Sequence, residues 1–326
     1  MPKGDSSVNR RFFKRYSPVL ILPLLLIALA CTSQDSDSPP EQNVSSVLDV
    51  VTTIYPVTYF AERVGGDKVN VKSFIKAGVD AHDFEPTPSD IIAIGDAEVL
   101  VYNHPELESW VADAISTSTS ESLIVIKAAD LPEDIKFNHE HDDEHGDEHE
   151  KMVDPHVWLN PLEAAEQVRA IQTAFSNADP VGTSTYAENA DALIAELLAT
   201  DKKFIDGLES CALDRVIVSH EAYGHIAGRY GFEQIGLSGL STETQPGPQR
   251  IAKIIDEIKV LGVNHILQEP TGNQELAKSV ASETDTEVLP FHPMESLTPA
   301  EVDSGKTYFS IMDENLKSLR AALRCE

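Results

Sequence analysis

The chain has 326 residues, with 25 basic against 54 acidic side chains and a net charge of −29 at pH 7. So acidic a chain argues against nucleic-acid binding, which needs positive surface, and it suits the attraction of cations. The chain is longer than one typical domain, and its length predicts two domains.

The first 30 residues are typical of a secretory signal peptide. A basic stretch at 10–15 precedes an apolar run at 19–29, which is shorter than the about 20 residues of a membrane-spanning helix. The end of this segment, Ala28-Leu29-Ala30-Cys31, resembles a bacterial lipobox and predicts lipidation of Cys31. Ordinary cleavage, with Cys31 incidental, is the alternative. Residues 31–46 are polar and predict a flexible tether, so we expect the protein outside the cytoplasm, lipid-anchored to the cell membrane or periplasmic.

Strands and helices alternate in the next part of the chain. Runs rich in β-branched residues predict strands at 47–55 (stopped by Pro56), 69–75, 99–102 and 123–126, and helical patterns lie at 58–64, 89–97 and 107–115. This alternation is typical of a parallel sheet covered by helices. It predicts an N-terminal α/β lobe over residues 47–181.

An acidic, histidine-rich loop at 138–150 interrupts this order. It carries seven acidic residues and four histidines, namely His139, His141, His145 and His149. We predict that this loop gathers zinc weakly; a solvated loop without that role is the alternative. Helical patterns follow at 161–175 and 186–208, and we expect segment 182–210 to be a stiff connecting helix rather than a hinge.

The second half repeats the alternation and predicts a C-terminal α/β lobe over 211–326. The expected strands are 215–219, 232–235, 265–268 and 287–289, and the expected helices are 222–230, 248–261, 274–283 and 308–323. The predicted fold is therefore two α/β lobes with parallel sheets flanked by helices, joined by a long rigid helix. Outside the cytoplasm, Cys211 and Cys325 predict a disulfide; zinc ligation is less favoured, because neither has a second ligand close in sequence.

Four isolated histidines, 64 to 74 residues apart, suggest a metal site. They are His82, His156, His220 and His292. Neutral imidazole is the commonest zinc ligand, and parallel α/β sheets bind ligands beyond the carboxyl ends of their strands. His82, His220 and His292 each follow a predicted strand, so we expect a site between the two lobes.

Four motifs in order resemble the metal-binding solute-binding proteins of bacterial ABC importers, the cluster A-I zinc/manganese family. They read GVDAHDFEPTPSD at 78–90, DPHVWLNP at 154–161, SHEAYG at 219–224 and QEP at 268–270. The resemblance covers about residues 47–324, and an acidic histidine-rich insertion before the second ligand is typical of its zinc branch. It implies a monomeric protein that is not an enzyme, captures Zn²⁺ between two lobes and delivers it to a membrane complex of an ABC permease and an ATPase.

The resemblance also implies the ligands. His82, His156 and His220 match the family's three metal-binding positions, and a histidine at the third favours zinc over manganese. The fourth position is often Asp or water, whereas the matching turn here carries His292. We expect His292 to be the fourth ligand, with Glu295 or water as alternatives. Copper and nickel would also bind such a site.

Other readings stay open. The chain could serve a manganese importer, or it could be a zinc-binding adhesin or a buffering lipoprotein that works without a transporter. A zinc hydrolase with Glu221 or Glu295 as base is less favoured, because His225 follows His220-Glu221 one residue too late for an HExxH motif. We expect His104, His225 and His265 to be structural.

Overall fold

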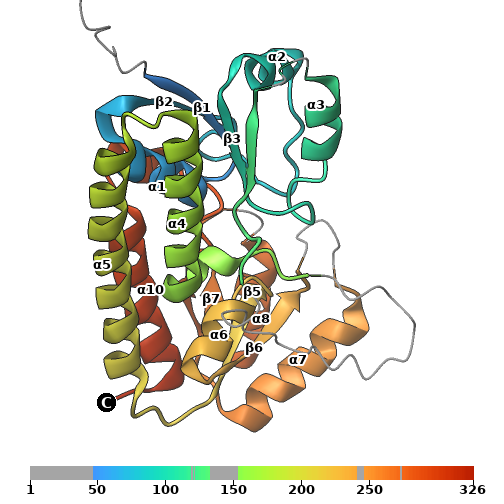
Figure 1. Cartoon of the computed structure of the whole chain (residues 1–326). Helices are drawn as coiled ribbons and strands as arrows, with labels where there is room; N and C mark the ends of the chain where they lie inside the picture. The colour runs from blue at the N-terminus through green and yellow to red at the C-terminus, as the bar shows by residue number, and fades with distance from the viewer. Residues whose placement is uncertain (1–46, 119, 121, 133–152, 241–245, 272–273) are drawn as a thin grey trace, which may run out of the picture. The chain divides into compact units, whose positions relative to one another are not determined.

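A computed structural model describes residues 47–118, 120, 122–132, 153–240, 246–271 and 274–326 (Figure 1). Several predicted segments lie outside these residues: the signal peptide 1–30, the tether 31–46 with Cys31, and the loop 138–150 with His139, His141, His145 and His149. Within the described ranges, no helix is both long and apolar enough to cross a membrane.

The first lobe is a parallel sheet with strand order β2-β1-β3-β4. Its strands are β1 (Leu48–Thr52), β2 (Val69–Ser73), β3 (Val99–Tyr102) and β4 (Ile124–Lys127). Between them lie α1 (Tyr55–Gly65), a 3₁₀ turn (Gly66–Lys68), α2 (Pro88–Asp96) and α3 (Val111–Thr117). Alternation of strand and helix therefore gives the predicted parallel sheet.

The second lobe repeats this topology, with strand order β6-β5-β7-β8. Its strands are β5 (Arg215–His220), β6 (Glu233–Ser238), β7 (His265–Gln268) and β8 (Glu287–Pro290). Its helices are α6 (Gly224–Tyr230), α7 (Pro248–Leu261), α8 (Glu275–Thr284), α9 (Pro299–Asp303) and α10 (Tyr308–Leu323). The predicted class, two parallel α/β lobes, is confirmed.

Two helices connect the lobes. A 3₁₀ turn (Val157–Leu159) leads into α4 (Pro161–Ala178), and α5 (Thr183–Leu208) follows. Helix α5 contacts α1 and α4 of the first lobe and α6 and α10 of the second, and it runs along one side of the molecule (Figure 1). It is the long connecting helix that the sequence predicts.

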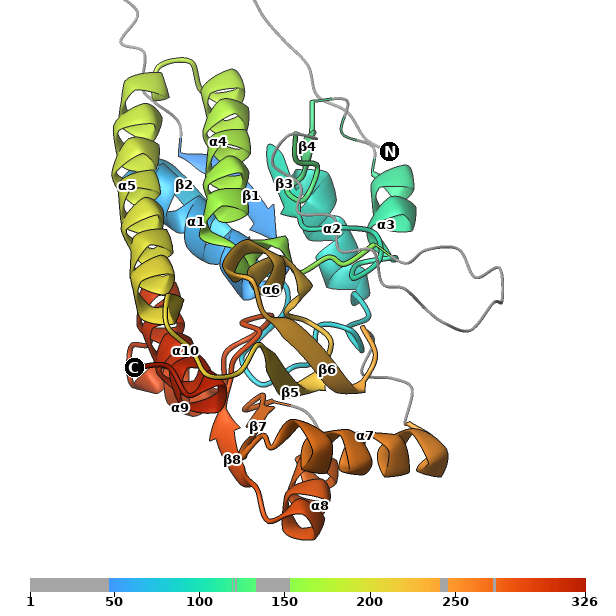
Figure 2. The same cartoon turned by 90° about the horizontal axis from the view of Figure 1, so that it is seen from below.

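Each sheet is covered on both faces. Successive side chains of a strand point to opposite sides, so one strand contributes to two hydrophobic cores. In β1, Val50 joins one hydrophobic core and Val51 another, which it shares with α2 and α3. In β5, Ile217 packs toward α7 and α8, whereas Val216 and Val218 face the opposite way. Figure 2 shows α7 and α8 on one side of this sheet and α10 on the other.

The inner faces of both sheets share one hydrophobic core. It runs from the first lobe to the second and includes Phe60 of α1, Phe175 of α4, Phe204 of α5, Val218 of β5 and Tyr308 of α10. The described residues accordingly form one compact unit rather than two separately packed bodies. Because apolar surface of each lobe is buried against the other, wide separation of the lobes would expose it to water.

The main differences from the predicted elements have local causes. We expected Pro56 to stop a strand, but it lies in the first turn of α1, where a helix has no use for its missing N–H group. Helix α3 begins at Val111 rather than 107, because Glu108 turns back and accepts hydrogen bonds from the main-chain N–H groups of Asn103 and His104. Helix α9 was not predicted.

The structure contains the predicted disulfide between Cys211 and Cys325, which are 114 residues apart. The same two segments are also joined by main-chain hydrogen bonds from Ala212 N to Arg324 O and from Leu213 N to Leu323 O. The C-terminus is thereby tied to the end of α5 and the start of β5.

Removing this disulfide should destabilise the protein. Disulfides typically stabilise proteins by about 2–4 kcal/mol. We therefore expect Cys211→Ser combined with Cys325→Ser to lower the free energy of unfolding by that amount in a denaturant titration. Reduction of the unaltered protein is the matched control and should produce a similar loss. An unchanged unfolding midpoint would contradict this expectation.

Candidate metal centre

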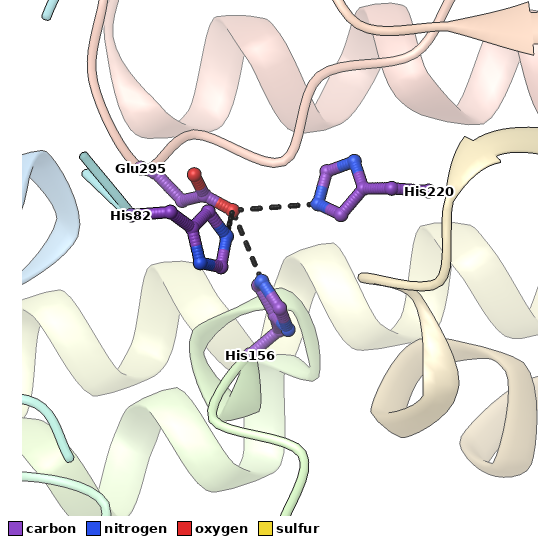
Figure 3. A group of neighbouring side chains, drawn as sticks. All are labelled: His82, His156, His220 and Glu295. Atoms are coloured by element: carbon purple, nitrogen blue, oxygen red, sulfur yellow. Dashed lines mark hydrogen bonds and ion pairs between the residues drawn. The ribbon is translucent and has the colours of Figure 1, made fainter. Parts of the chain in front are cut away.

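Three histidines and one glutamate converge in the structure. His82, His156, His220 and Glu295 each offer one ligand atom, and these atoms all lie within 4.8 Å of one another (Figure 3). Among the described residues, this is the one group of three or more His, Cys, Asp or Glu side chains with such an arrangement. The structure thus brings together three of the four histidines singled out from the sequence.

The four side chains come from distant segments of both lobes. His82 lies in the loop between β2 and α2, and His156 directly precedes the 3₁₀ turn before α4. His220 is the last residue of β5, and Glu295 lies in the loop between β8 and α9. Only the folded chain brings these groups together, which is typical of a metal site rather than of a local structural contact.

One oxygen of Glu295 lies at the middle of the group (Figure 3). The distances from Glu295 Oε1 to the Nε2 atoms are 3.0 Å for His156, 3.4 Å for His82 and 3.5 Å for His220. The Nε2 atoms of His82 and His220 are buried and make no well-directed hydrogen bond to any described residue. A metal ion among these four atoms would give each of them a partner.

Carboxylates outside the group fix the orientation of two imidazoles. Asp154 Oδ1 lies 2.7 Å from Nδ1 of His156, and Glu269 Oε1 lies 3.1 Å from Nδ1 of His220. A carboxylate at Nδ1 keeps the proton on that atom and leaves Nε2 to face a metal ion. No role was predicted for Asp154 or Glu269, although they lie in the motifs at 154–161 and 268–270.

The electrostatics of the group favour an ionised Glu295 and a protonated His220. Burial would raise the pKa of Glu295, but the hydrogen bond from His156 and the nearby rings of His220 and His82 hold that pKa well below its usual range. Burial would lower the pKa of His220, but Glu269 and Glu295 outweigh it and raise the pKa to about 10. A metal ion must therefore displace protons when it enters.

The first lobe holds His156 through a buried polar network. Asn103, which follows β3, donates a hydrogen bond from Nδ2 to the carbonyl of Pro155 over 2.7 Å. Glu108 accepts from the main chain of Asn103 and from the hydroxyl of Thr53, which follows β1. The ends of the two neighbouring strands β1 and β3 thus fix the main chain beside His156.

The second lobe contacts the same segment through His225 of α6. His225 Nε2 lies 3.0 Å from the carbonyl oxygen of Asp154, and Nδ1 lies 2.8 Å from Oε2 of the buried Glu163 in α4. Burial would lower the pKa of His225, but Glu163 and Asp154 raise it to about 9. We expected His225 to be structural, and its contacts show that it joins α4 and α6 at the segment that carries His156.

The structure does not bring His292 into the group. His292 Nδ1 accepts a hydrogen bond of 2.9 Å from the main-chain N–H of Met294, and Nε2 lies 3.2 Å from Glu301 Oε2. Of the fourth ligands left open by the sequence, it is Glu295 that faces the three imidazoles. Glu221 points elsewhere, with Oε1 3.2 Å from Arg250 Nη2.

Fold and site together define the class of the protein. Two parallel α/β lobes of the same strand order share a long connecting helix, and each lobe contributes imidazoles to one buried group. The class is that of two-lobed solute-binding proteins with a site for a divalent metal ion.

The chain belongs to the family described as "Zinc-uptake complex component A periplasmic", which matches residues 50–322. It is 31% identical over 314 residues to the high-affinity zinc uptake system protein ZnuA of Bacillus subtilis, covering 95% of this chain and 98% of that protein. The resemblance inferred from the four motifs is therefore confirmed.

Two further comparisons agree with this assignment. The chain is 33% identical over 312 residues to the zinc-binding lipoprotein AdcA of Streptococcus pneumoniae, covering 94% of this chain but only 60% of the length of that relative. The crystal structure of the Zn(II)-bound ZnuA-like domain of Streptococcus pneumoniae AdcA superposes with a TM-score of 0.72 at 32% identity, covering 85% of this chain and 98% of that domain.

Proposed function

We propose that this protein captures zinc outside the cytoplasm and delivers it to an ABC-type membrane importer. The convergence of His82, His156, His220 and Glu295 on one buried point is the observation that carries the proposal. The similarity to proteins named for zinc binding and zinc uptake supports it. Zinc is here the cargo of the protein, and Glu295 takes the place of the expected fourth ligand His292.

The donor set favours zinc over manganese. Zinc takes four ligands in a tetrahedral arrangement, with imidazole nitrogen at about 2.0–2.1 Å and carboxylate oxygen at about 2.0–2.2 Å. Manganese favours oxygen ligands and higher coordination numbers, which three imidazoles and one carboxylate oxygen do not supply. The proposed site is therefore three Nε2 atoms and one oxygen of Glu295.

The location and partners of the protein belong to the same proposal. A signal peptide, a lipid on Cys31 and a tether over 31–46 would hold a monomeric body at the outer face of the membrane. There it would meet a complex of permease and ATPase that withdraws the ion. A relative named as a zinc-binding lipoprotein supports the anchor, and the family's description as a component of a zinc-uptake complex supports the partner.

Metal analysis of the purified protein tests the proposal. We expect one tightly bound zinc ion per chain, and competition titrations should rank zinc above manganese. Deleting residues 138–150 should leave this tight site intact, since none of its four side chains lies there. Failure to bind one zinc ion tightly, or a preference for manganese, would contradict the proposed function.

Zinc binding should weaken as the pH falls. Imidazole binds zinc in its neutral form, and the pKa of His220, about 10 in the metal-free protein, means that protons occupy this ring throughout the neutral range. A group with a raised pKa keeps its proton until an ion displaces it, so the affinity should rise from about pH 5 to about pH 8. Calorimetry in buffers of different ionisation enthalpy should measure the released protons. A constant affinity over this range would contradict a histidine-dominated site.

A further inference from the structure

The loop that carries Glu295 is attached to its surroundings at almost every residue. The carbonyl of Phe291 accepts from the Tyr223 hydroxyl over 2.7 Å, and that of Pro293 accepts from Trp158 Nε1 over 2.6 Å. Glu295 itself accepts at its carbonyl from the main-chain N–H of Tyr55 over 3.0 Å. The contacts come from both lobes and make the loop a rigid support for the carboxylate.

His292 holds this loop in two ways. Its main-chain N–H and carbonyl bond to the side chain of Asn315 in α10, at 2.8 and 2.9 Å. Its imidazole accepts from Met294 N at Nδ1, so a neutral ring carries its proton on Nε2, which then donates to Glu301 over 3.2 Å. Both ring nitrogens are occupied, and neither is left for a metal ion.

The bond to Met294 falls at a strained point of the main chain. Met294 has a φ of 64°, in the left-handed region that residues with a side chain rarely adopt. Such a conformation persists where surrounding contacts impose it. Here Nδ1 of His292 accepts a hydrogen bond from the N–H group of Met294, and the next residue is Glu295. The strained turn therefore sets the direction in which the Glu295 carboxylate leaves the main chain.

We infer that His292 is a positioning residue for the zinc site, which holds the turn at Met294 so that Glu295 meets the three imidazoles. This inference rests on the proposed function. His292 acts through the main chain and does not touch the ion. Without its imidazole, the turn can relax, Glu295 is held less firmly, and water can enter at the fourth position. Zinc should then dissociate faster, while the three histidines still bind it.

Two variants separate the contacts of the ring. His292→Phe keeps a ring of similar size but has neither nitrogen. His292→Asn retains an acceptor that can bond the N–H two residues ahead, as asparagine does in turns, but it loses the contact with Glu301. Substituting His265, which lies at the opposite end of β7 from the site, by Phe provides a matched control outside the loop.

The experiment combines zinc affinity, the rate of zinc release to a chelator and the visible absorption of the cobalt(II)-loaded full chain. We expect His292→Phe to bind zinc about 10-fold more weakly through faster release, a loss typical of supporting contacts around a metal. Its cobalt(II) absorption should shift, because water in place of the Glu295 oxygen changes the ligand field of the ion. His292→Asn should recover most of both properties, and His265→Phe should match the unaltered protein.

Other outcomes would overturn the inference. An affinity and a cobalt spectrum of His292→Phe equal to those of the unaltered protein would show that the ring does not position Glu295. A loss as large as that from removing His220, with no recovery in His292→Asn, would show that His292 is itself a ligand. Failure of the unaltered protein to bind zinc would instead refute the proposed function. If His292→Phe does not fold, a cobalt spectrum of His292→Asn that differs from the unaltered one as strongly as that of Glu295→Ala overturns the inference.

Discussion

Replacing His220 by alanine should weaken zinc binding by at least about 100-fold. Zinc held by four protein ligands is bound with about 10–16 kcal/mol in small zinc domains, so one ligand of four accounts for about 3 kcal/mol, and each 1.4 kcal/mol is a factor of ten. The substitution also leaves the buried carboxylates of Glu269 and Glu295 without the ring that lies between them. Competition with a chromophoric chelator of known affinity measures the change.

His265 provides the matched control for this substitution. It is the first residue of β7, whereas His220 is the last residue of the neighbouring parallel strand β5. The two residues therefore lie at opposite ends of these strands. His265→Ala removes the same atoms and should leave zinc affinity unchanged. If both variants bound zinc as the unaltered protein does, His220 would not be a ligand. Equal losses in both would point to general destabilisation of the second lobe.

The pattern of strands and helices could be predicted because it depends on local periodicity. Strands β3 and β7 and helices α7 and α10 have the predicted bounds, since each is a continuous apolar or amphipathic run with clear ends. Helix α3 was predicted to start too early. Its apolar pattern does not show that the Glu108 side chain accepts hydrogen bonds from the main chain of Asn103 and His104. The core shared by the lobes could not be predicted either: periodicity identifies a buried face but not its partner.

Local sequence patterns also limited the prediction of the metal site. His82 and His220 follow predicted strands and His156 lies in a recognisable motif, so sequence reasoning could select all three. His292 and Glu295 lie in one turn, and their separate directions depend on the positive φ of Met294, which no neighbouring glycine signals. The choice of His292 as a ligand followed position alone, whereas the geometry places Glu295 beside the three imidazoles.

The start of α10 joins the two lobes. Tyr308 is fully buried, and its ring packs edge-on against Phe60 of α1, with centroids 5.2 Å apart, and stacks on Tyr59 at 6.2 Å. Its hydroxyl donates to the carbonyl of Trp158 over 2.6 Å, two residues after His156. The remainder of α10 packs on strands β5, β7 and β8 of the second lobe. One side chain of the C-terminal lobe is thereby inserted into the core of the first.

Tyr308→Ala should therefore lower the free energy of unfolding by about 3–5 kcal/mol, as expected when a buried aromatic ring is removed. Tyr308→Phe is the matched control: it keeps the ring, loses the bond to Trp158, and should lower the free energy of unfolding by about 1 kcal/mol.

Denaturant titration can follow both lobes at once. The protein has two tryptophans. Trp110 reports the first lobe by fluorescence, and Trp158, whose indole N–H bonds to the carbonyl of Pro293, reports the contact between the lobes. Far-ultraviolet circular dichroism reports all helices. Because the lobes share one core, the two signals should change together in the unaltered protein. Separate transitions would mean that the lobes are stable independently. Such independence would remove the ground for expecting small movements around a common core rather than wide closure of two bodies.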